Sequence, residues 1–171
     1  MKPEIFDNFL PPEQFRIIAD TIMGEEFPWF FCPGKSYSDV MKNDKTIFQF
    51  FHLFYMNHGW ISQFGQMLDP ILQVLKPVAI IRIKANMTTI TPTLVQYDFH
   101  RDTSKNLVKS KTACFYVNTN NGYTVFNSGE RVESVANRLV VFNSDNLHTG
   151  TSSTDESRRI VINFNYFTQA V

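Results

Sequence analysis

The chain has 171 residues, of which 43% are hydrophobic and 15% aromatic, so it can bury one sizeable core and wholesale disorder is excluded. Sixteen basic and sixteen acidic side chains cancel, which argues against the broad positive surface of a protein that coats nucleic acid. The two cysteines, Cys32 and Cys114, form no CxxC pair, so neither a disulfide framework nor a thiolate zinc site is expected.

The N-terminal part, about residues 1–77, is expected to be mainly helical. The stretch LPPEQFRIIADTIMG opens with proline, places Phe15, Ile18 and Ile22 on one face and ends at Gly24, which is typical of an amphipathic helix. The stretch GWISQFGQMLDPILQVL predicts a second helix that is kinked or split at its proline. The apolar side of this second helix is predicted to consist of Trp60, Phe64, Met67, Ile71 and Leu75.

The sequence also favours a soluble protein. Its first fifteen residues, MKPEIFDNFLPPEQF, lack the apolar segment of a signal peptide. No apolar run approaches the roughly twenty residues that a membrane-spanning helix needs. We therefore expect a cytoplasmic protein that does not associate with membranes, with an oligomeric state that the sequence leaves open.

From Val78 onward, β-branched and aromatic runs alternate with turn residues, which is the pattern of many short strands. The candidate strands are VAIIRIKAN, TLVQYDFH, KTACFYVN, YTVF, ERVES, NRLVVFN and RRIVINFNYF. Helices followed by about seven strands indicate an α+β, mainly β fold, in which a jelly roll is braced by the N-terminal helices. We expect a single domain over residues 1–171, with its jelly-roll core at about residues 78–168.

Two histidines and one aspartate suggest metal chemistry. His100 and Asp102 are separated by one residue, and alternate residues of a strand point to the same face. An HxD pair alone is more often a solvated strand end, but His148 follows the strand RLVVF and can come across from a neighbouring strand. Two histidines and one carboxylate suit non-haem Fe(II) and leave three coordination positions open. Two other histidines, His52 and His58, have no carboxylate at ligand-like spacing and are assigned no role.

The last strand, RRIVINFNYF, offers an anchor for an anion. Its alternation places Arg159 on one face with Asn163 and Asn165, while the apolar residues of the other face pack against the helices. A guanidinium at Arg159 can grip a carboxylate through paired hydrogen bonds. Arg158 belongs to the opposite face and is expected to be a solvent-facing charge, whereas a structural salt bridge is the alternative for Arg159.

The series His100, Asp102, His148 and Arg159 resembles the pattern of the Fe(II)- and 2-oxoglutarate-dependent oxygenases, in particular the prolyl 4-hydroxylase-like branch. The stretches RIKAN, KTACFYVNTNNGYTVF, RLVVFNSDNLHTGT and RRIVINFNYF look like oxygenase-like proteins that marine bacteriophages encode. This resemblance covers about residues 80–167 well and the N-terminal helices more loosely.

The resemblance implies a double-stranded β-helix that holds Fe(II) on the two histidines and Asp102, with 2-oxoglutarate chelating the iron. It implies that Arg159 binds the distal carboxylate of 2-oxoglutarate with Tyr116 as a helper. Asn163, on the same face as Arg159, is expected to touch the cosubstrate or an iron-bound water, and ascorbate is expected as an accessory reductant.

The activity implied is hydroxylation of a C–H bond in a prolyl or other peptidyl substrate, or in an amino acid, with succinate and CO2 as co-products. O2 is the other substrate, and the balanced charge disfavours nucleic acid. The host cytoplasm is the expected location if a phage encodes the chain. Two alternatives stay open at this point. One is a catalytically silent jelly-roll module with a binding or structural, virion-type role, and the other is a cupin-like metal enzyme that does not use 2-oxoglutarate.

Overall fold

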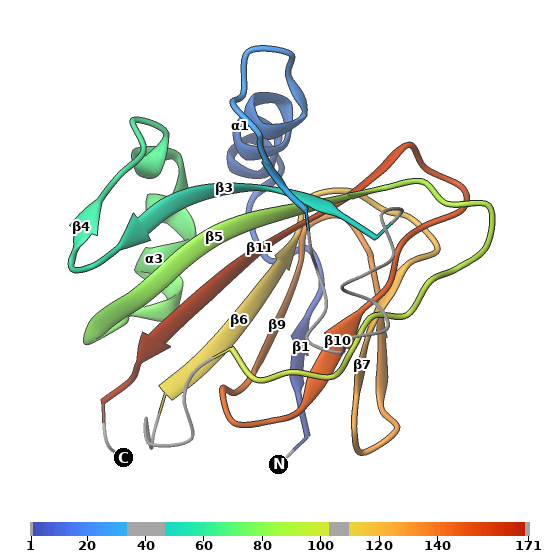
Figure 1. Ribbon diagram of the computed structural model, residues 1–171. Helices are drawn as coiled ribbons and strands as arrows, with labels where there is room; N and C mark the ends of the chain where they lie inside the picture. Colours follow the sequence, from blue (N-terminus) through green and yellow to red (C-terminus); the bar gives the residue numbers. More distant parts are fainter. Residues whose placement is uncertain (1, 34–46, 103–109, 170–171) are drawn as a thin grey trace.

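The computed structural model describes residues 2–33, 47–102 and 110–169, and a large antiparallel sheet dominates this part of the chain (Figure 1). The strand order of this sheet is β1-β9-β6-β11-β5-β3-β2, and β4 pairs with β3 beside it. A second, three-stranded sheet has the order β10-β7-β8. The large sheet comprises β1 (Glu4–Phe6), β2 (Phe30–Cys32), β3 (Gln49–Met56), β4 (Gly59–Trp60), β5 (Ala79–Thr89), β6 (Ser110–Tyr116), β9 (Arg138–Asn143) and β11 (Arg158–Phe167). The small sheet comprises β7 (Tyr123–Phe126), β8 (Arg131–Glu133) and β10 (His148–Gly150). This arrangement is consistent with the predicted jelly roll.

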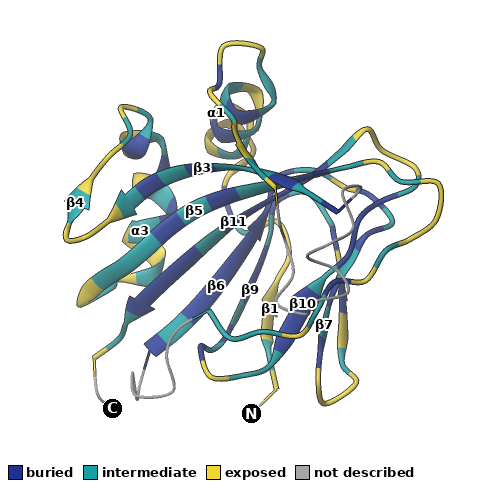
Figure 2. Ribbon diagram, in the orientation of Figure 1, coloured by how far each residue is buried: buried dark blue, intermediate teal, exposed yellow. Residues whose placement is uncertain are grey.

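The two faces of β11 differ in the way its alternation predicts. Ile160, Ile162, Phe164 and Tyr166 are all buried in the main hydrophobic cluster. The opposite face carries Arg159 and the two asparagines toward the small sheet. Figure 2 shows that β11 is buried along most of its length, as expected for a strand paired on both sides, with β5 and with β6. The central strand therefore has one mainly apolar face and one mixed face, on which Val161 belongs to a second, smaller hydrophobic cluster beside the polar side chains.

The helices cover the apolar face of the large sheet. Helix α1 spans Pro12–Met23 and buries Ile18 and Ile22 in the same cluster as the apolar side chains of β11. The 3-10 turn η1 (Gly65–Leu68) leads directly into the short helix α3 (Asp69–Leu75), and both add buried leucine or isoleucine side chains to that cluster. Because these elements cover one face, the other face is left to form the polar cavity.

The second predicted helix is shorter than its pattern suggested. Pro70 lies in the first turn of α3, where a backbone N–H has no acceptor within the helix. The missing N–H of proline therefore costs no hydrogen bond there, and Pro70 starts a helix and does not kink one. Trp60 belongs to β4 and is 47% exposed, so it does not contribute to the apolar face of a helix. The expectation of a mainly helical segment over residues 1–77 is thus wrong in part, since four of the strands lie within it.

The strand predicted at TLVQYDFH is also wrong. Residues 93–100 form no continuous strand and contribute only two isolated bridges, which pair Gln96 with Thr151 and His100 with His148. The other six candidate strands are confirmed, and β10 was missed. Among the described residues, no helix is both long and apolar enough to cross a membrane.

Candidate metal centre and anion site

Three side chains from two segments converge at one end of the polar face. His100 and Asp102 follow β5 in the chain, whereas His148 begins β10 of the small sheet. The backbones of His100 and His148 form a bridge, with N···O distances of 2.9 and 3.1 Å, and this bridge brings the two segments together. The ligand atoms of the three residues all lie within 4.8 Å of one another, so the group can hold a metal ion. The structure thus brings together the three residues that sequence spacing singled out, although a bridge and not a regular strand supports the first two; their role as metal ligands stays a prediction.

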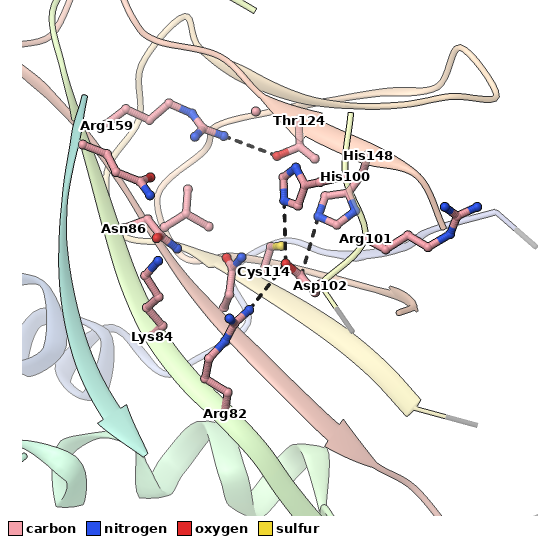
Figure 3. A pocket seen from close by; sticks show the side chains of 14 residues that line it. Arg82, Lys84, Asn86, His100, Arg101, Asp102, Cys114, Thr124, His148 and Arg159 are labelled. Atoms are coloured by element: carbon pink, nitrogen blue, oxygen red, sulfur yellow. Dashed lines mark hydrogen bonds and ion pairs between the residues drawn. The ribbon is translucent and has the colours of Figure 1, made fainter. Parts of the chain in front are cut away.

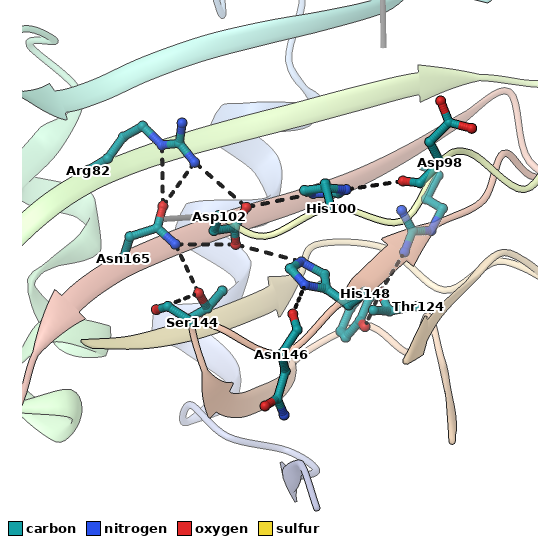
Figure 4. Close-up of polar contacts among 12 residues, drawn as sticks. Arg82, Asp98, His100, Asp102, Thr124, Ser144, Asn146, His148 and Asn165 are labelled. Carbon is teal, nitrogen blue, oxygen red and sulfur yellow. Dashed lines mark hydrogen bonds and ion pairs between the residues drawn. The ribbon is translucent and has the colours of Figure 1, made fainter. Parts of the chain in front are cut away.

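Both imidazoles present the same nitrogen to the carboxylate. Nε2 of His100 lies 3.7 Å from Oδ1 of Asp102, and Nε2 of His148 lies 3.7 Å from Oδ2 (Figure 4). Each Nδ1 faces a backbone carbonyl two residues earlier, at 3.3 Å for His100 and 3.0 Å for His148. A carbonyl accepts a hydrogen bond from Nδ1–H, and this tautomer leaves the lone pair of Nε2 available to a metal. Hence the two rings are oriented as metal ligands usually are.

A second layer of contacts fixes the carboxylate of Asp102, whose side chain is only 4% exposed. Asn165 donates from Nδ2 to Oδ2 at 3.2 Å, and Arg82 lies 3.7 Å from Oδ1. Burial on its own raises the pKa of this carboxyl, but His148, His100 and Arg82 together with the amide of Asn165 lower it below the ordinary value. The carboxylate is therefore held ionised, as a metal ligand must be.

Sequence reasoning missed the residues that hold this carboxylate. Arg82 also donates from Nε and Nη2 to Oδ1 of Asn165, at 3.2 and 3.1 Å, and Asn165 donates to Thr112 at 3.0 Å (Figure 4). Arg82 and Asn165 are cross-strand partners in the pairing of β5 with β11. The polar alternation of β5 was a usable signal, but the register that sets Arg82 opposite Asn165 is not visible in the sequence.

Arg159 lies at the other end of the polar face and is 5% exposed. Its Nε donates to Ser134 Oγ at 2.8 Å and its Nη2 to Thr124 Oγ1 at 3.3 Å. Burial lowers its pKa from the ordinary value, although Tyr116, Cys114 and Tyr97 act in the opposite direction. The alternative of a structural salt bridge is not supported, because no carboxylate within residues 2–33, 47–102 and 110–169 forms an ion pair with it. A buried cation whose hydrogen-bond partners in the described part of the chain are hydroxyl groups suits an anionic ligand.

Two glycines make room for this guanidinium. A Cβ on Gly122 would come within 2.6 Å of Arg159 Cδ and within 2.6 Å of the backbone oxygen of Ser152. A Cβ on Gly150 would lie 3.3 Å from Nη1 of the same arginine. Gly122 is therefore a steric requirement of the Arg159 site, and at Gly150 a side chain would make a tight contact with the guanidinium.

Arg158, the neighbouring arginine, has a structural contact. Its Nη2 donates to the carbonyl oxygen of Met23 at 2.7 Å, at the end of helix α1. The expectation of a solvent-facing charge is thus wrong, because the end of the helix lies over this face of the sheet and its carbonyl needs a donor. The two arginines do point to opposite faces, as predicted.

Tyr116 and Asn163 lie close to Arg159 in different ways. Tyr116 is fully buried, its ring centroid is 5.7 Å from Cζ of Arg159, and its hydroxyl donates to Thr124 Oγ1 at 2.8 Å. Asn163 lines the cavity on the same face as Arg159. Roles for both in binding a cosubstrate stay predictions, and that of Tyr116 would act through Thr124.

The two ends share one solvent-accessible cavity of about 160 Å³ between the large and small sheets (Figure 3). The three candidate metal ligands and Arg159 line it, and the side chains of β5 form one wall. Figure 3 shows Arg101 directed away from the triad, as expected of the residue between His100 and Asp102. Its Nε donates to the carbonyl oxygen of Asp145 at 2.8 Å.

His52 has a purely structural environment. It is 4% exposed and packs against Phe27 and Phe54, with ring centroids at 4.4 and 4.7 Å. Its nitrogens contact the carbonyl of Pro28 at 2.8 Å and the hydroxyl of Ser62 at 2.7 Å. Burial lowers the pKa of this imidazole. These contacts agree with the absence of a predicted role.

Comparison with known proteins gives a consistent fold. No family model and no curated protein sequence matches the chain. An oxidoreductase of the 2OG-Fe(II) oxygenase family from Burkholderia pseudomallei has a TM-score of 0.70 and 11% identity, over 96% of this chain and 84% of that one. A viral collagen prolyl hydroxylase from Paramecium Bursaria Chlorella virus-1 gives 0.58 and 11%, over 99% and 91%. A prolyl-4-hydroxylase from Pseudomonas putida gives 0.54 and 14%, over 98% and 93%. The resemblance inferred from sequence is confirmed at the level of the fold.

Proposed function

We propose that this protein is a non-haem Fe(II)- and 2-oxoglutarate-dependent dioxygenase that hydroxylates a C–H bond. The observation that carries the proposal is the pairing, in one cavity, of a His-Asp-His group with a buried arginine that lacks a carboxylate partner among the described residues. Many proteins share one of these two features, but their combination on a jelly roll matches the needs of one metal and one dicarboxylate. A silent structural module would require neither feature.

The donor set fits Fe(II). Two neutral imidazole nitrogens and one carboxylate occupy three positions and leave others open for a cosubstrate and O2. His100 and His148 would bind through Nε2, and Asp102 through an oxygen whose orientation Asn165 and Arg82 fix. Bound Fe(II) would supply the oxidative chemistry, in which 2-oxoglutarate and O2 yield succinate and CO2 while one oxygen atom enters the substrate C–H bond.

The protein's own part is to bind, orient and exclude water. Arg159 would hold the distal carboxylate of 2-oxoglutarate through charge-assisted hydrogen bonds, so that the 2-oxo acid end faces the triad. Thr124 and Ser134 keep the guanidinium in place, and Gly122 and Gly150 allow it to lie there. The second alternative, a cupin-like enzyme that does not use 2-oxoglutarate, does not explain why the buried guanidinium of Arg159 faces the cavity.

Succinate formation provides the direct test. Purified protein with Fe(II), 2-oxoglutarate and ascorbate is expected to release succinate slowly even without a prime substrate. His100→Ala and Asp102→Ala should abolish this turnover, whereas Asp20→Ala, an exposed carboxylate on α1, should leave it unchanged. Succinate release that survives in both triad variants would contradict the proposal.

Anaerobic spectroscopy gives an independent readout. Addition of Fe(II) and then 2-oxoglutarate should produce a visible charge-transfer band in the parent protein and none in His100→Ala. Absence of this band from the parent protein would exclude chelation of 2-oxoglutarate by a metal at this site. A prolyl, peptidyl or free amino-acid substrate can then be sought by stimulation of 2-oxoglutarate turnover.

A further inference from the structure

The cavity carries an excess of positive charge. Four of its lining side chains are cationic, namely Arg82, Lys84, Arg101 and Arg159, and Asp102 is its one carboxylate in the part of the chain that the structure describes. Fe(II) and the dianion of 2-oxoglutarate would add equal and opposite charges. Even without Arg101, which is directed away from the triad, an excess of two positive charges therefore persists in the state that would receive a prime substrate.

Three of these cations already have a task. Arg159 belongs to the anion site, Arg101 is bound to the carbonyl of Asp145, and Arg82 braces Asp102. Lys84 remains. Its ammonium lies 5.2 Å from the centroid of the Phe51 ring, and it forms no ion pair within the described residues. Figure 3 shows the Lys84 side chain directed into the cavity from the wall that β5 forms.

Lys84 also lies beside a like charge. Arg82 and Lys84 are alternate residues of β5 and point to the same face, where Asn165 and Asn163 are their cross-strand partners. Partial burial, then the charge of Arg82, lower the pKa of Lys84, although Cys32 and Asp102 act in the opposite direction. Two adjacent cations that are partly removed from water repel each other, and an anion between them would relieve this repulsion.

This pair is separate from the Arg159 site. Thr88 is the residue of β5 opposite Arg159, and it lies four residues beyond Lys84. At roughly 3.3 Å per residue this corresponds to about 13 Å along the strand. Lys84 therefore starts from a strand position that is two residues from Arg82 and four from the residue opposite Arg159, which groups it with Arg82.

We propose that the prime substrate is a small carboxylic acid whose carboxylate binds between Lys84 and Arg82 on β5. This inference rests on the proposed function and narrows its substrate class. It favours a free amino acid or an acylated amino acid with a free carboxylate over a residue inside a peptide chain, which has no charge at that position. Lys84 supplies a point charge, and Arg82 adds its Nη1 group, which takes no part in the contacts of Nε and Nη2 with Asn165 and Asp102. The aromatic ring of Phe51 borders the site.

Matched acids and amides test the inference by binding alone. The probes are N-acetyl-L-amino acids and their primary carboxamides, titrated calorimetrically into protein loaded with Mn(II) and 2-oxoglutarate, which does not turn over. At least one acid should bind roughly tenfold more tightly than its amide, the factor expected of a charge-assisted hydrogen bond. If no acid binds better than its amide, the proposal is overturned.

Variants assign the preference to the correct side chain. Lys84→Gln should remove the preference for acid over amide, and Lys76→Gln, an exposed lysine after α3, should retain it. In the absence of ligand, Lys84→Met should unfold at a higher Tm than the parent protein, because the repulsion with Arg82 is gone. If Lys84→Gln instead weakens 2-oxoglutarate binding and leaves the acid preference intact, Lys84 serves the cosubstrate and the proposal fails.

The outcome is separable from that of the proposed function. Succinate release without any prime substrate tests the oxygenase, whereas the preference for acids is measured without turnover. A protein that releases succinate but does not distinguish acids from amides is an oxygenase with a neutral substrate. A protein that prefers acids through Lys84 but forms no succinate binds carboxylic acids without this chemistry.

Discussion

The variants Arg159→Met and Arg158→Met each replace one of two adjacent arginines, which point to opposite faces of β11. Methionine keeps much of the side-chain volume, so the comparison removes charge and hydrogen bonds without opening a large cavity. We expect Arg159→Met to weaken 2-oxoglutarate binding by more than about a hundredfold. Two charge-assisted hydrogen bonds at about 1.5 kcal/mol each account for this factor.

The effects on stability should run in the opposite order. Arg159→Met loses hydrogen bonds to Ser134 and Thr124. It also removes a desolvated charge that has no carboxylate partner in the described chain. Because these two effects oppose each other, its free energy of unfolding should change by less than about 1 kcal/mol. Arg158→Met loses the bond to the Met23 carbonyl and should be destabilised by about 1 to 2 kcal/mol, with 2-oxoglutarate affinity unchanged.

Two measurements decide the comparison. Anaerobic titration of 2-oxoglutarate into the Fe(II) protein gives the dissociation constants, and urea unfolding without 2-oxoglutarate gives the stabilities. Similar losses of 2-oxoglutarate affinity in the two variants would refute the assignment of faces on β11. A strongly destabilised Arg159→Met protein would instead show that the guanidinium has a structural role.

Three further variants test the surroundings of the site. Asn165→Leu should weaken Mn(II) binding by about 10- to 100-fold in a metal titration, because the Asp102 carboxylate loses its amide donor; unchanged affinity would show that Arg82 alone suffices. Gly122→Ala should cost about 1 to 3 kcal/mol in urea unfolding and weaken 2-oxoglutarate binding, whereas Gly59→Ala, with nothing within 4 Å of the added Cβ, should change stability by less than about 0.5 kcal/mol. Tyr116→Phe removes one donor to Thr124 and should raise the 2-oxoglutarate dissociation constant by less than about tenfold; a larger rise would indicate direct contact with the cosubstrate.

The parts of the fold that sequence predicted are those in which one face is apolar and the other polar. In β11 this contrast is strong, with Val161 as the apolar exception on the cavity face, so the assignment of Arg159 to the cavity face and of Ile160 to the core face followed from alternation alone. The triad was predictable for a related reason, since the types and spacing of its three residues restrict the chemistry strongly.

Strand β3 was missed because its sequence, QFFHLFYM, is apolar at nearly every position. Both of its faces are at least partly covered, and its sequence has neither the alternation of a half-buried strand nor the periodicity of an amphipathic helix.

The residues that hold the Asp102 carboxylate were missed for another reason. The contacts of Arg82 with Asp102 and Asn165 join residues 20 and 83 positions apart, and only strand register brings them together.

The pairing of β5 with β11 shows how that register is kept. Ile83 and Ile80 both face the hydrophobic core, although they are three residues apart and regular alternation would place them on opposite faces. The register shift between Asn165 and Tyr166 resolves this, because it leaves one residue of β5 without a partner and sets Ile80 opposite Tyr166. Such a bulge lets the strand continue in the core while Arg82 still faces the cavity. A β5 without the bulge would have to turn either Arg82 into the apolar layer or Ile80 into the cavity, so the irregularity allows Arg82 to reach Asp102 while Ile80 stays in the core.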